Sequence, residues 1–217
     1  MSKDAVLRGL RECGVLPVVR APSADEAVAL GEAIVAGGLP VLEITLTVPD
    51  ALAAIERLAA KLGDSVLIGA GSVLDAAGVR ASVEAGARFI VTPAFDAEAL
   101  QACRDLSVAC IVGALTPTEI LLASRAGADW VKVFPCDAVG GARYLRSLKG
   151  PLPNIPLVPT GGVTLDTLGD YFNAGAVAVG VGSDLADLAA LRSGDAARIS
   201  GKARAYARAR AAARRPG

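Results

Sequence analysis

Eight short runs of apolar residues recur along the chain, and each is rich in Val, Ile or Leu. They occupy residues 16–20, 41–45, 66–69, 89–92, 109–113, 130–134, 157–160 and 177–180. Because apolar residues fill consecutive positions and not only alternate ones, the runs predict strands that are buried on both faces. Between them lie stretches rich in Ala and Leu, with the spacing typical of helices.

The boundaries of the predicted helices carry repeated signals. Ser23, Asp75, Asp96 and Thr116 have side chains suited to capping a helix amino terminus. An Ala-Gly pair precedes four of the strands, at residues 36–37, 85–86, 126–127 and 174–175, and predicts a left-handed helix end. Strand and helix therefore alternate eight times, which predicts the α/β class and a parallel (β/α)8 (TIM) barrel. No linker interrupts the alternation, so we expect a single barrel domain over residues 1–217, with residues 1–13 as an extra helix closing its lower end.

Composition narrows the classes of function. Of the 217 residues, 53% are hydrophobic and only 4% are aromatic, so we expect an aliphatic core. The 22 basic residues balance the 22 acidic ones, which argues against a nucleic-acid partner, and we interpret the arginines of residues 203–215 as the solvated face of a last helix. No apolar stretch is long enough to span a bilayer, so we expect no membrane association.

The four cysteines are far apart, form no Cys-x-x-Cys pair and follow no signal peptide, which predicts reduced thiols and a cytoplasmic protein. The chain has no histidine, so His-ligated zinc and His-based acid/base catalysis are excluded. We therefore expect no metal and no cofactor.

The most informative residue is Lys132, which lies inside a predicted buried strand. Desolvation disfavours the charged form of an amine, and a neutral amine is a nucleophile for carbonyl carbons. The alternative interpretation is a strand-end lysine that reaches solvent or pairs with a carboxylate.

Active sites of such barrels lie at the carboxyl ends of the strands. The second and sixth predicted strands are both even-numbered, so Glu43 and Lys132 can occupy one layer of the barrel and meet across its axis. Glu43 could simply neutralise the lysine, or it could move protons while the lysine attacks a carbonyl. A catalytic amine must spend time uncharged, so we expect a water or a small gap between the two groups.

Two glycine-rich loops follow the last two predicted strands and contain Gly161, Gly162, Gly182 and Ser183. Backbone N–H groups at such positions in barrel enzymes commonly hold phosphate, although glycines there also serve as tight turns. A second anion, such as a carboxylate, would need a cation or hydroxyls from Arg20, Ser72 or Thr160.

Several motifs together resemble one family of enzymes. They include Leu-Glu-Ile-Thr at 42–45, Gly-Ala-Gly-Ser at 69–72, Val-Thr-Pro at 91–93, Val-Lys-Val-Phe-Pro at 131–135, Pro-Thr-Gly-Gly at 159–162 and Gly-Val-Gly-Ser at 180–183. From about Val15 to Ser183, the chain resembles the bacterial 2-keto-3-deoxy-6-phosphogluconate (KDPG) / 4-hydroxy-2-oxoglutarate (KHG) aldolases. The resemblance implies a metal-free barrel, commonly a homotrimer, that serves the Entner-Doudoroff pathway.

The resemblance also implies roles for individual residues. Lys132 would form a Schiff base with the substrate ketone, and Glu43 would be the general acid/base. Ser72 and Thr160 would hold the substrate carboxylate, while Phe134 and Pro93 would line the pocket. The phosphate would lie on backbone N–H groups near the four glycine-loop residues, and Thr45 and Thr47 would belong to the pocket.

One departure concerns the substrate. Thr47 stands where some members of the family have an arginine, and Arg20 can supply that cation, as in relatives that act on the galactonate epimer. The expected reaction is cleavage of the phosphorylated keto acid KDPG to pyruvate and glyceraldehyde 3-phosphate. The alternatives are KHG or the 6-phosphogalactonate epimer as substrate, a phosphate-ligand-binding barrel, or a structural trimer without chemistry.

Overall fold

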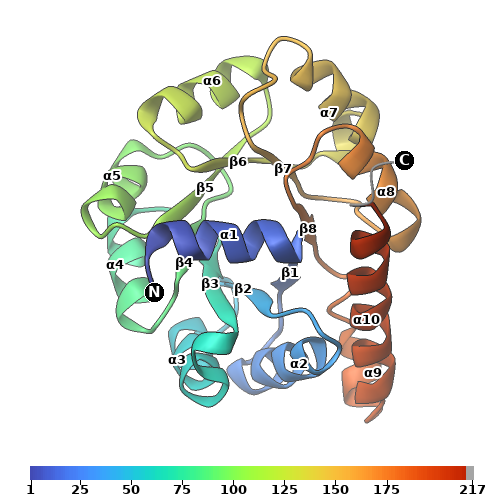
Figure 1. Cartoon of the computed structure of the whole chain (residues 1–217). Coiled ribbons are helices and arrows are strands. Elements are labelled where there is room, and N and C mark those ends of the chain that lie inside the picture. The colour runs from blue at the N-terminus through green and yellow to red at the C-terminus, as the bar shows by residue number, and fades with distance from the viewer. Residues whose placement is uncertain (214–217) are drawn as a thin grey trace.

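The computed structural model describes residues 1–213, in which eight parallel strands form a nearly closed barrel surrounded by helices (Figure 1). The strands are β1 (Val15–Val19), β2 (Val41–Thr45), β3 (Leu67–Gly71), β4 (Phe89–Val91), β5 (Ala109–Ala114), β6 (Trp130–Val133), β7 (Leu157–Pro159) and β8 (Val179–Val181). Neighbours in the chain are neighbours in the sheet, and β8 pairs with β1. A single bridge between Thr160 and Gly180 joins the last two strands. The predicted (β/α)8 barrel is confirmed.

The helices follow the strands in turn. They are α1 (Lys3–Cys13), α2 (Ala24–Ala36), α3 (Ala51–Leu62), α4 (Ala76–Glu84), α5 (Ala97–Asp105), α6 (Pro117–Ala126), α7 (Gly141–Lys149), α8 (Leu165–Asn173), α9 (Leu188–Arg192) and α10 (Ala196–Ala213), with 3-10 turns η1 (Gly63–Ser65) and η2 (Asp137–Val139). The four predicted capping side chains each accept a hydrogen bond from the backbone three residues on. These caps fix where each helix begins and, with it, the length of the loop that leaves the preceding strand.

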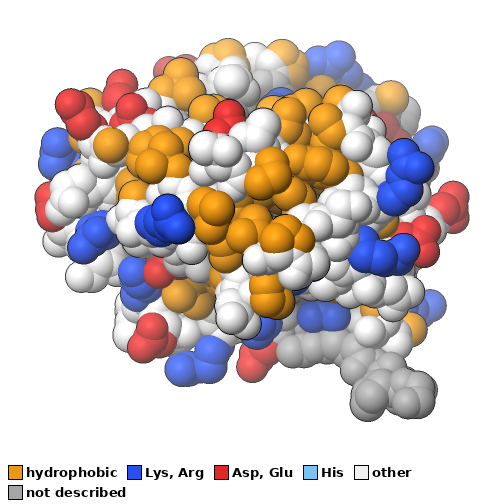
Figure 2. Space-filling view, turned by 90° about the horizontal axis from the view of Figure 1, so that it is seen from above, with side chains coloured by type: hydrophobic (Ala, Val, Ile, Leu, Met, Phe, Trp, Pro, Cys, Tyr) orange, Lys and Arg blue, Asp and Glu red, His pale blue; other side chains and the backbone are white. Residues whose placement is uncertain are grey.

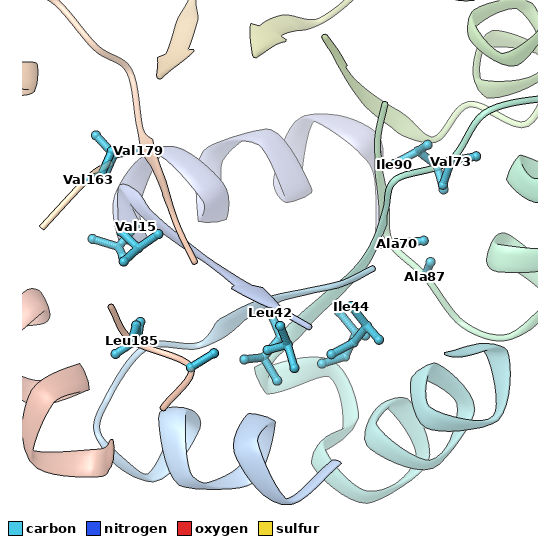
Figure 3. Close-up of a cluster of buried hydrophobic side chains, with 14 of the residues drawn as sticks. Val15, Leu42, Ile44, Ala70, Val73, Ala87, Ile90, Val163, Val179 and Leu185 are labelled. Atoms are coloured by element: carbon cyan, nitrogen blue, oxygen red, sulfur yellow. The ribbon is translucent and has the colours of Figure 1, made fainter. Parts of the chain in front are cut away.

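The main core lies between the outer face of the strands and the surrounding helices. Leu42 and Ile44 of β2 point outward toward the helices (Figure 3). Glu43 lies between them in sequence and contacts Lys132 of β6 instead. The same outer layer contains Val15, Ala70 and Ile90. Because both faces of each strand are covered, the runs of consecutive apolar residues have a direct structural cause.

A second cluster fills the amino-terminal half of the barrel. Its members include Leu16, Leu67, Phe89, Ile111 and Trp130, which come from five different strands. Helix α1 lies across this end (Figure 1) and adds Val6 and Leu10 to the cluster. An ion pair between Lys3 and Asp129 at 2.8 Å ties α1 to the start of β6. The predicted extra helix therefore closes one end of the barrel.

The prediction for the last helix needs a correction. Helix α10 begins at Ala196, seven residues before the predicted start, and Arg210 is buried with its guanidinium 4.1 Å from the centre of the Phe172 ring. Only part of the arginine set is therefore solvated, because α10 packs against α2 and α8. Arg214 and Arg215 lie outside the described residues. Within residues 1–213, no helix combines the length and apolar character needed to cross a membrane.

Candidate active site

Lys132 and Glu43 meet inside the barrel. Their side chains are 4% and 2% exposed, and Nζ of Lys132 lies 3.6 Å from Oε1 of Glu43. The register explains the meeting: Glu43 pairs with Gly69 of β3, and Lys132 pairs with Gly113 of β5 and Val158 of β7. Both residues come from even-numbered strands and point to the axis from opposite sides of the barrel.

The separation of the two groups matches the expected gap. Charge-assisted N–H···O bonds are typically about 2.7–2.9 Å long, so a contact of 3.6 Å is not a tight ion pair. Among the described residues, Oε1 of Glu43 is buried and has no hydrogen-bond partner. An unsatisfied buried acceptor is costly, by about 1–3 kcal/mol, unless a bound molecule satisfies it. The site therefore offers a free acceptor beside an amine.

Gly71 makes the space that the Glu43 carboxylate occupies. A Cβ atom at position 71 would lie 2.1 Å from Oε1 of Glu43, which is closer than side chains tolerate. Gly113 makes space for the turn after β4 in the same way, since a Cβ atom at position 113 would lie 2.2 Å from the carbonyl of Pro93. The N–H of Gly113 donates to Oγ1 of Thr92, and that hydroxyl donates to the Ala94 carbonyl. These bonds fix the turn that carries Pro93.

A cavity of about 440 Å³ opens at the carboxyl end of the barrel, beside the strands that carry the glycine loops. It contains most of the predicted substrate-binding residues: Arg20, Phe134, Thr160, Gly161, Gly162, Gly182 and Ser183. Gly161 and Gly162 have φ angles of 103° and 64°, a conformation that favours glycine over residues with a side chain. The two loops and Arg20 thus border one cavity.

A second cavity, of about 400 Å³, lies on the other side of Phe134. It is more apolar and is lined by residues that include Pro93, Phe95, Leu115, Leu122 and Phe134. Phe134 borders both cavities, and its ring centre lies 5.2 Å from Nζ of Lys132. The ring is therefore shared by a polar and an apolar cavity and lies near the amine, although neither Lys132 nor Glu43 lines either cavity.

The remaining predicted residues lie at the ends of β2 and β3. Oγ1 of Thr45 donates to the Val19 carbonyl and lies 2.8 Å from Oγ1 of Thr47. Ser72 directly follows β3 and has a left-handed φ of 57°. None of these three residues lines either cavity; all three lie at the carboxyl ends of β2 and β3.

Two features were not predicted from the sequence. Asp184 lines the polar cavity and accepts hydrogen bonds from Lys202 and Tyr206 of α10, and Thr164 lines the same cavity at the start of α8. Cys136 lies near this cavity, because its N–H donates to the Thr160 carbonyl. Its thiol is a further candidate nucleophile. Burial raises the pKa of its thiol to about 11, so it carries little thiolate at neutral pH.

Comparison with known proteins identifies close relatives. Residues 6–201 match the family described as KDPG and KHG aldolase. The 2-dehydro-3-deoxy-phosphogluconate aldolase of Pseudomonas aeruginosa is 40% identical over 161 residues, which are 74% of this chain and 73% of that protein. The KDPG aldolase of Legionella pneumophila, solved with pyruvate captured at low pH as a covalent carbinolamine intermediate, has a TM-score of 0.84 at 31% identity, over 91% of this chain and 97% of that one. A structure described as native KDPGal has a TM-score of 0.84 at 32% identity, over 92% and 95% of the two chains.

Proposed function

Because this chain belongs to the KDPG and KHG aldolase family and is a carbon–carbon lyase, we propose that it cleaves KDPG to pyruvate and glyceraldehyde 3-phosphate through a Schiff base on Lys132. The observation that carries the proposal is the buried pair of Lys132 and Glu43, whose facing atoms are 3.6 Å apart. A lysine in that position has no short ion pair among the described residues, so its amine is available for addition to a ketone.

Imine formation is the first stage of the proposed reaction. Neutral Nζ of Lys132 adds to the C2 carbonyl carbon and gives a carbinolamine. Glu43, as the acid, donates a proton to the departing hydroxyl, and water leaves to form the protonated imine. Oε1 of Glu43 has no hydrogen-bond partner among the described residues and lies 3.6 Å from the amine, so it is close to the carbinolamine carbon's hydroxyl and nitrogen.

Carbon–carbon cleavage follows. The Glu43 carboxylate takes the proton of the C4 hydroxyl, the C3–C4 bond breaks, and its electron pair moves into the protonated imine, which becomes an enamine. Glyceraldehyde 3-phosphate leaves. The enamine is then protonated at C3, and water hydrolyses the resulting imine to release pyruvate and the free lysine.

The polar cavity suggests where the anionic groups of the substrate bind. The glycine loops offer backbone N–H groups for the phosphate, and Arg20 lines the same cavity as a cation for an anionic group. Thr160 borders that cavity and directly follows β7, the strand that pairs with β6 beside Lys132, so we assign it to the carboxylate next to the imine. Ser72 is assigned the same role from family resemblance, and its position after β3 lies at the same end of the barrel.

Borohydride trapping tests the proposal directly. Incubation with pyruvate and borohydride should reduce the imine and add a stable pyruvyl group to the peptide that contains Lys132, as detected by mass spectrometry after digestion. The same treatment without pyruvate is the control. A protein that binds phosphate ligands but forms no adduct would contradict the aldolase mechanism.

KHG and the 6-phosphogalactonate epimer remain second candidate substrates. The epimer is favoured by one observation: Arg20 lines the polar cavity, whereas Thr47 supplies only a hydroxyl at the end of β2. Comparing kcat/KM for the two phosphorylated epimers and the unphosphorylated dicarboxylate would rank all three.

We further propose that the enzyme is a homotrimer that works in the cytoplasm, where its four free thiols would stay reduced. Apolar side chains gather on the face seen from above (Figure 2), and α6, which carries the exposed Leu122, lies at the top of Figure 1. Leu122→Asp should convert trimers to monomers in sedimentation velocity, because a charge at a buried interface is costly. Leu106→Asp, at a similarly exposed leucine after α5, is the control; a wild-type monomer would contradict the proposal.

A further inference from the structure

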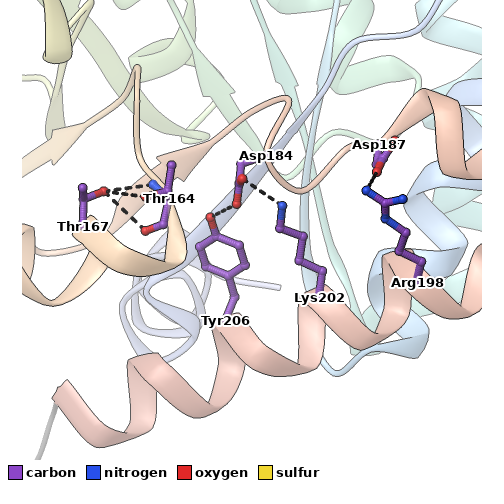
Figure 4. Close-up of polar contacts among 7 residues, drawn as sticks. All are labelled: Thr164, Thr167, Asp184, Asp187, Arg198, Lys202 and Tyr206. Carbon is purple, nitrogen blue, oxygen red and sulfur yellow. Dashed lines mark hydrogen bonds and ion pairs between the residues drawn. The ribbon is translucent and has the colours of Figure 1, made fainter.

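Three side chains on one face of α10 contact the segment that follows β8 (Figure 4). Arg198, Lys202 and Tyr206 are spaced four residues apart, so they lie in one row along the helix. Arg198 pairs with Asp187 at 3.3 Å, and the other two both bind Asp184. This row ties a terminal helix to the loop that contains Gly182 and Ser183.

The Asp184 carboxylate is held at both oxygens. Nζ of Lys202 lies 2.8 Å from Oδ1, and the Tyr206 hydroxyl donates to Oδ2 at 2.5 Å. The Tyr206 side chain is fully buried, and burial raises its pKa, so the hydroxyl keeps its proton and remains a donor at neutral pH. Asp184 also lines the polar cavity. A carboxylate at this position would repel an anionic group unless its charge is matched.

The same helix supports the other glycine loop. Helix α8 begins at Leu165, separated from Gly161 and Gly162 only by Val163 and Thr164. Helix α10 packs along it, with Arg210 stacked over Phe172. The start of α8 is fixed by Thr164, whose N–H donates to the Thr167 hydroxyl (Figure 4). The loop after β8 thus contacts α10 directly, and the loop after β7 is connected to α10 through α8.

We propose that Lys202 and Tyr206 are positioning residues for the phosphate end of the substrate. They neutralise and orient Asp184, so that the loop after β8 presents Gly182 and Ser183 to the phosphate without repulsion from the neighbouring carboxylate. The inference rests on the proposed function, because it takes the glycine loops as the phosphate site. Neither Lys202 nor Tyr206 lines the polar cavity, so both act through Asp184.

Kinetics of single variants test the inference. Lys202→Met and Tyr206→Phe should each raise KM for KDPG by about fivefold to tenfold, with kcat changed by less than about twofold. The first variant leaves the Asp184 charge unmatched, and the second removes a hydrogen bond to that charge. The pyruvate concentration needed for half-maximal borohydride trapping should not change, because pyruvate has no phosphate. Arg204→Met, at an exposed position on the same helix, is the matched control.

A charge-rescue variant separates repulsion from general damage. Asp184→Asn in the Lys202→Met background should lower KM most of the way back to the wild-type value, because it removes the unmatched carboxylate. An unchanged KM in both single variants, or an equal loss of pyruvate trapping, would overturn the inference, as would failure of the rescue. Calorimetric titration with inorganic phosphate gives a readout that does not need cleavage. If the wild-type enzyme does not cleave KDPG but the variants bind phosphate more weakly than it does, only the proposed substrate is wrong. If the variants bind phosphate as tightly as the wild type, the positioning role is wrong.

Discussion

Lys132→Met is expected to lower kcat for KDPG cleavage at least about 10,000-fold, to a level near the background reaction. The variant keeps an unbranched side chain in the barrel but removes the only atom that can form the imine in the proposed mechanism. Pyruvate release gives the rate, and borohydride trapping should leave the variant unlabelled. More than a trace of activity would assign the nucleophile to another residue.

The folding control for this variant follows from the geometry of the pair. Replacing the lysine alone leaves the Glu43 carboxyl group buried, at 2% exposure, without the amine that faces it. Removing one member of a buried pair commonly destabilises a protein by about 3–5 kcal/mol. The double variant Lys132→Met/Glu43→Gln has no buried charge in this pair, so it should regain part of that stability and remain inactive. Thermal unfolding followed by circular dichroism would compare the two.

Glu43→Gln is expected to lower kcat by about 100-fold or more, because glutamine occupies the same volume but can neither accept nor donate the transferred proton. Its amide also fits the space that Gly71 leaves for the carboxylate. The enzyme should still form the pyruvate adduct, only more slowly, since the lysine is intact. Exchange of the pyruvate methyl protons with deuterium from solvent isolates the enamine step and should slow in parallel with cleavage.

An unchanged rate of cleavage or of exchange in Glu43→Gln would move the acid/base role elsewhere. Thr160→Val provides a useful comparison, because Thr160 lines the cavity but carries no titratable proton in the proposed steps. That variant should chiefly raise KM.

The barrel and its central pair could be predicted because both depend on local patterns. Consecutive apolar residues mark strands covered on both faces, and the parity of the strands decides which side chains share a layer. Glu43 and Lys132 interrupt two such runs, so their inward direction followed from Leu42, Ile44, Val131 and Val133 being needed on the outside. The same logic placed the glycine loops together, since the last two strands are neighbours around the barrel.

Contacts made by α10 could not be predicted in the same way. Tyr206 and Asp184 are 22 residues apart, and their meeting depends on how the helix rolls against α2 and α8. Nothing in the local spacing of charges distinguishes Lys202, which binds Asp184, from the arginines that face solvent. Arg210 illustrates the same limit, because its burial over Phe172 depends on a partner 38 positions earlier in the chain.

Helix α1 and the apolar cluster beneath it seal the amino-terminal end of the barrel. Within the described residues, this seal closes one side of Lys132, so a ligand can approach the amine only from the carboxyl end, where Phe134 and the polar cavity lie. In the proposed reaction, the keto end of the substrate would then have to enter first. The aldehyde would leave through the same end before the fragment bonded to the lysine.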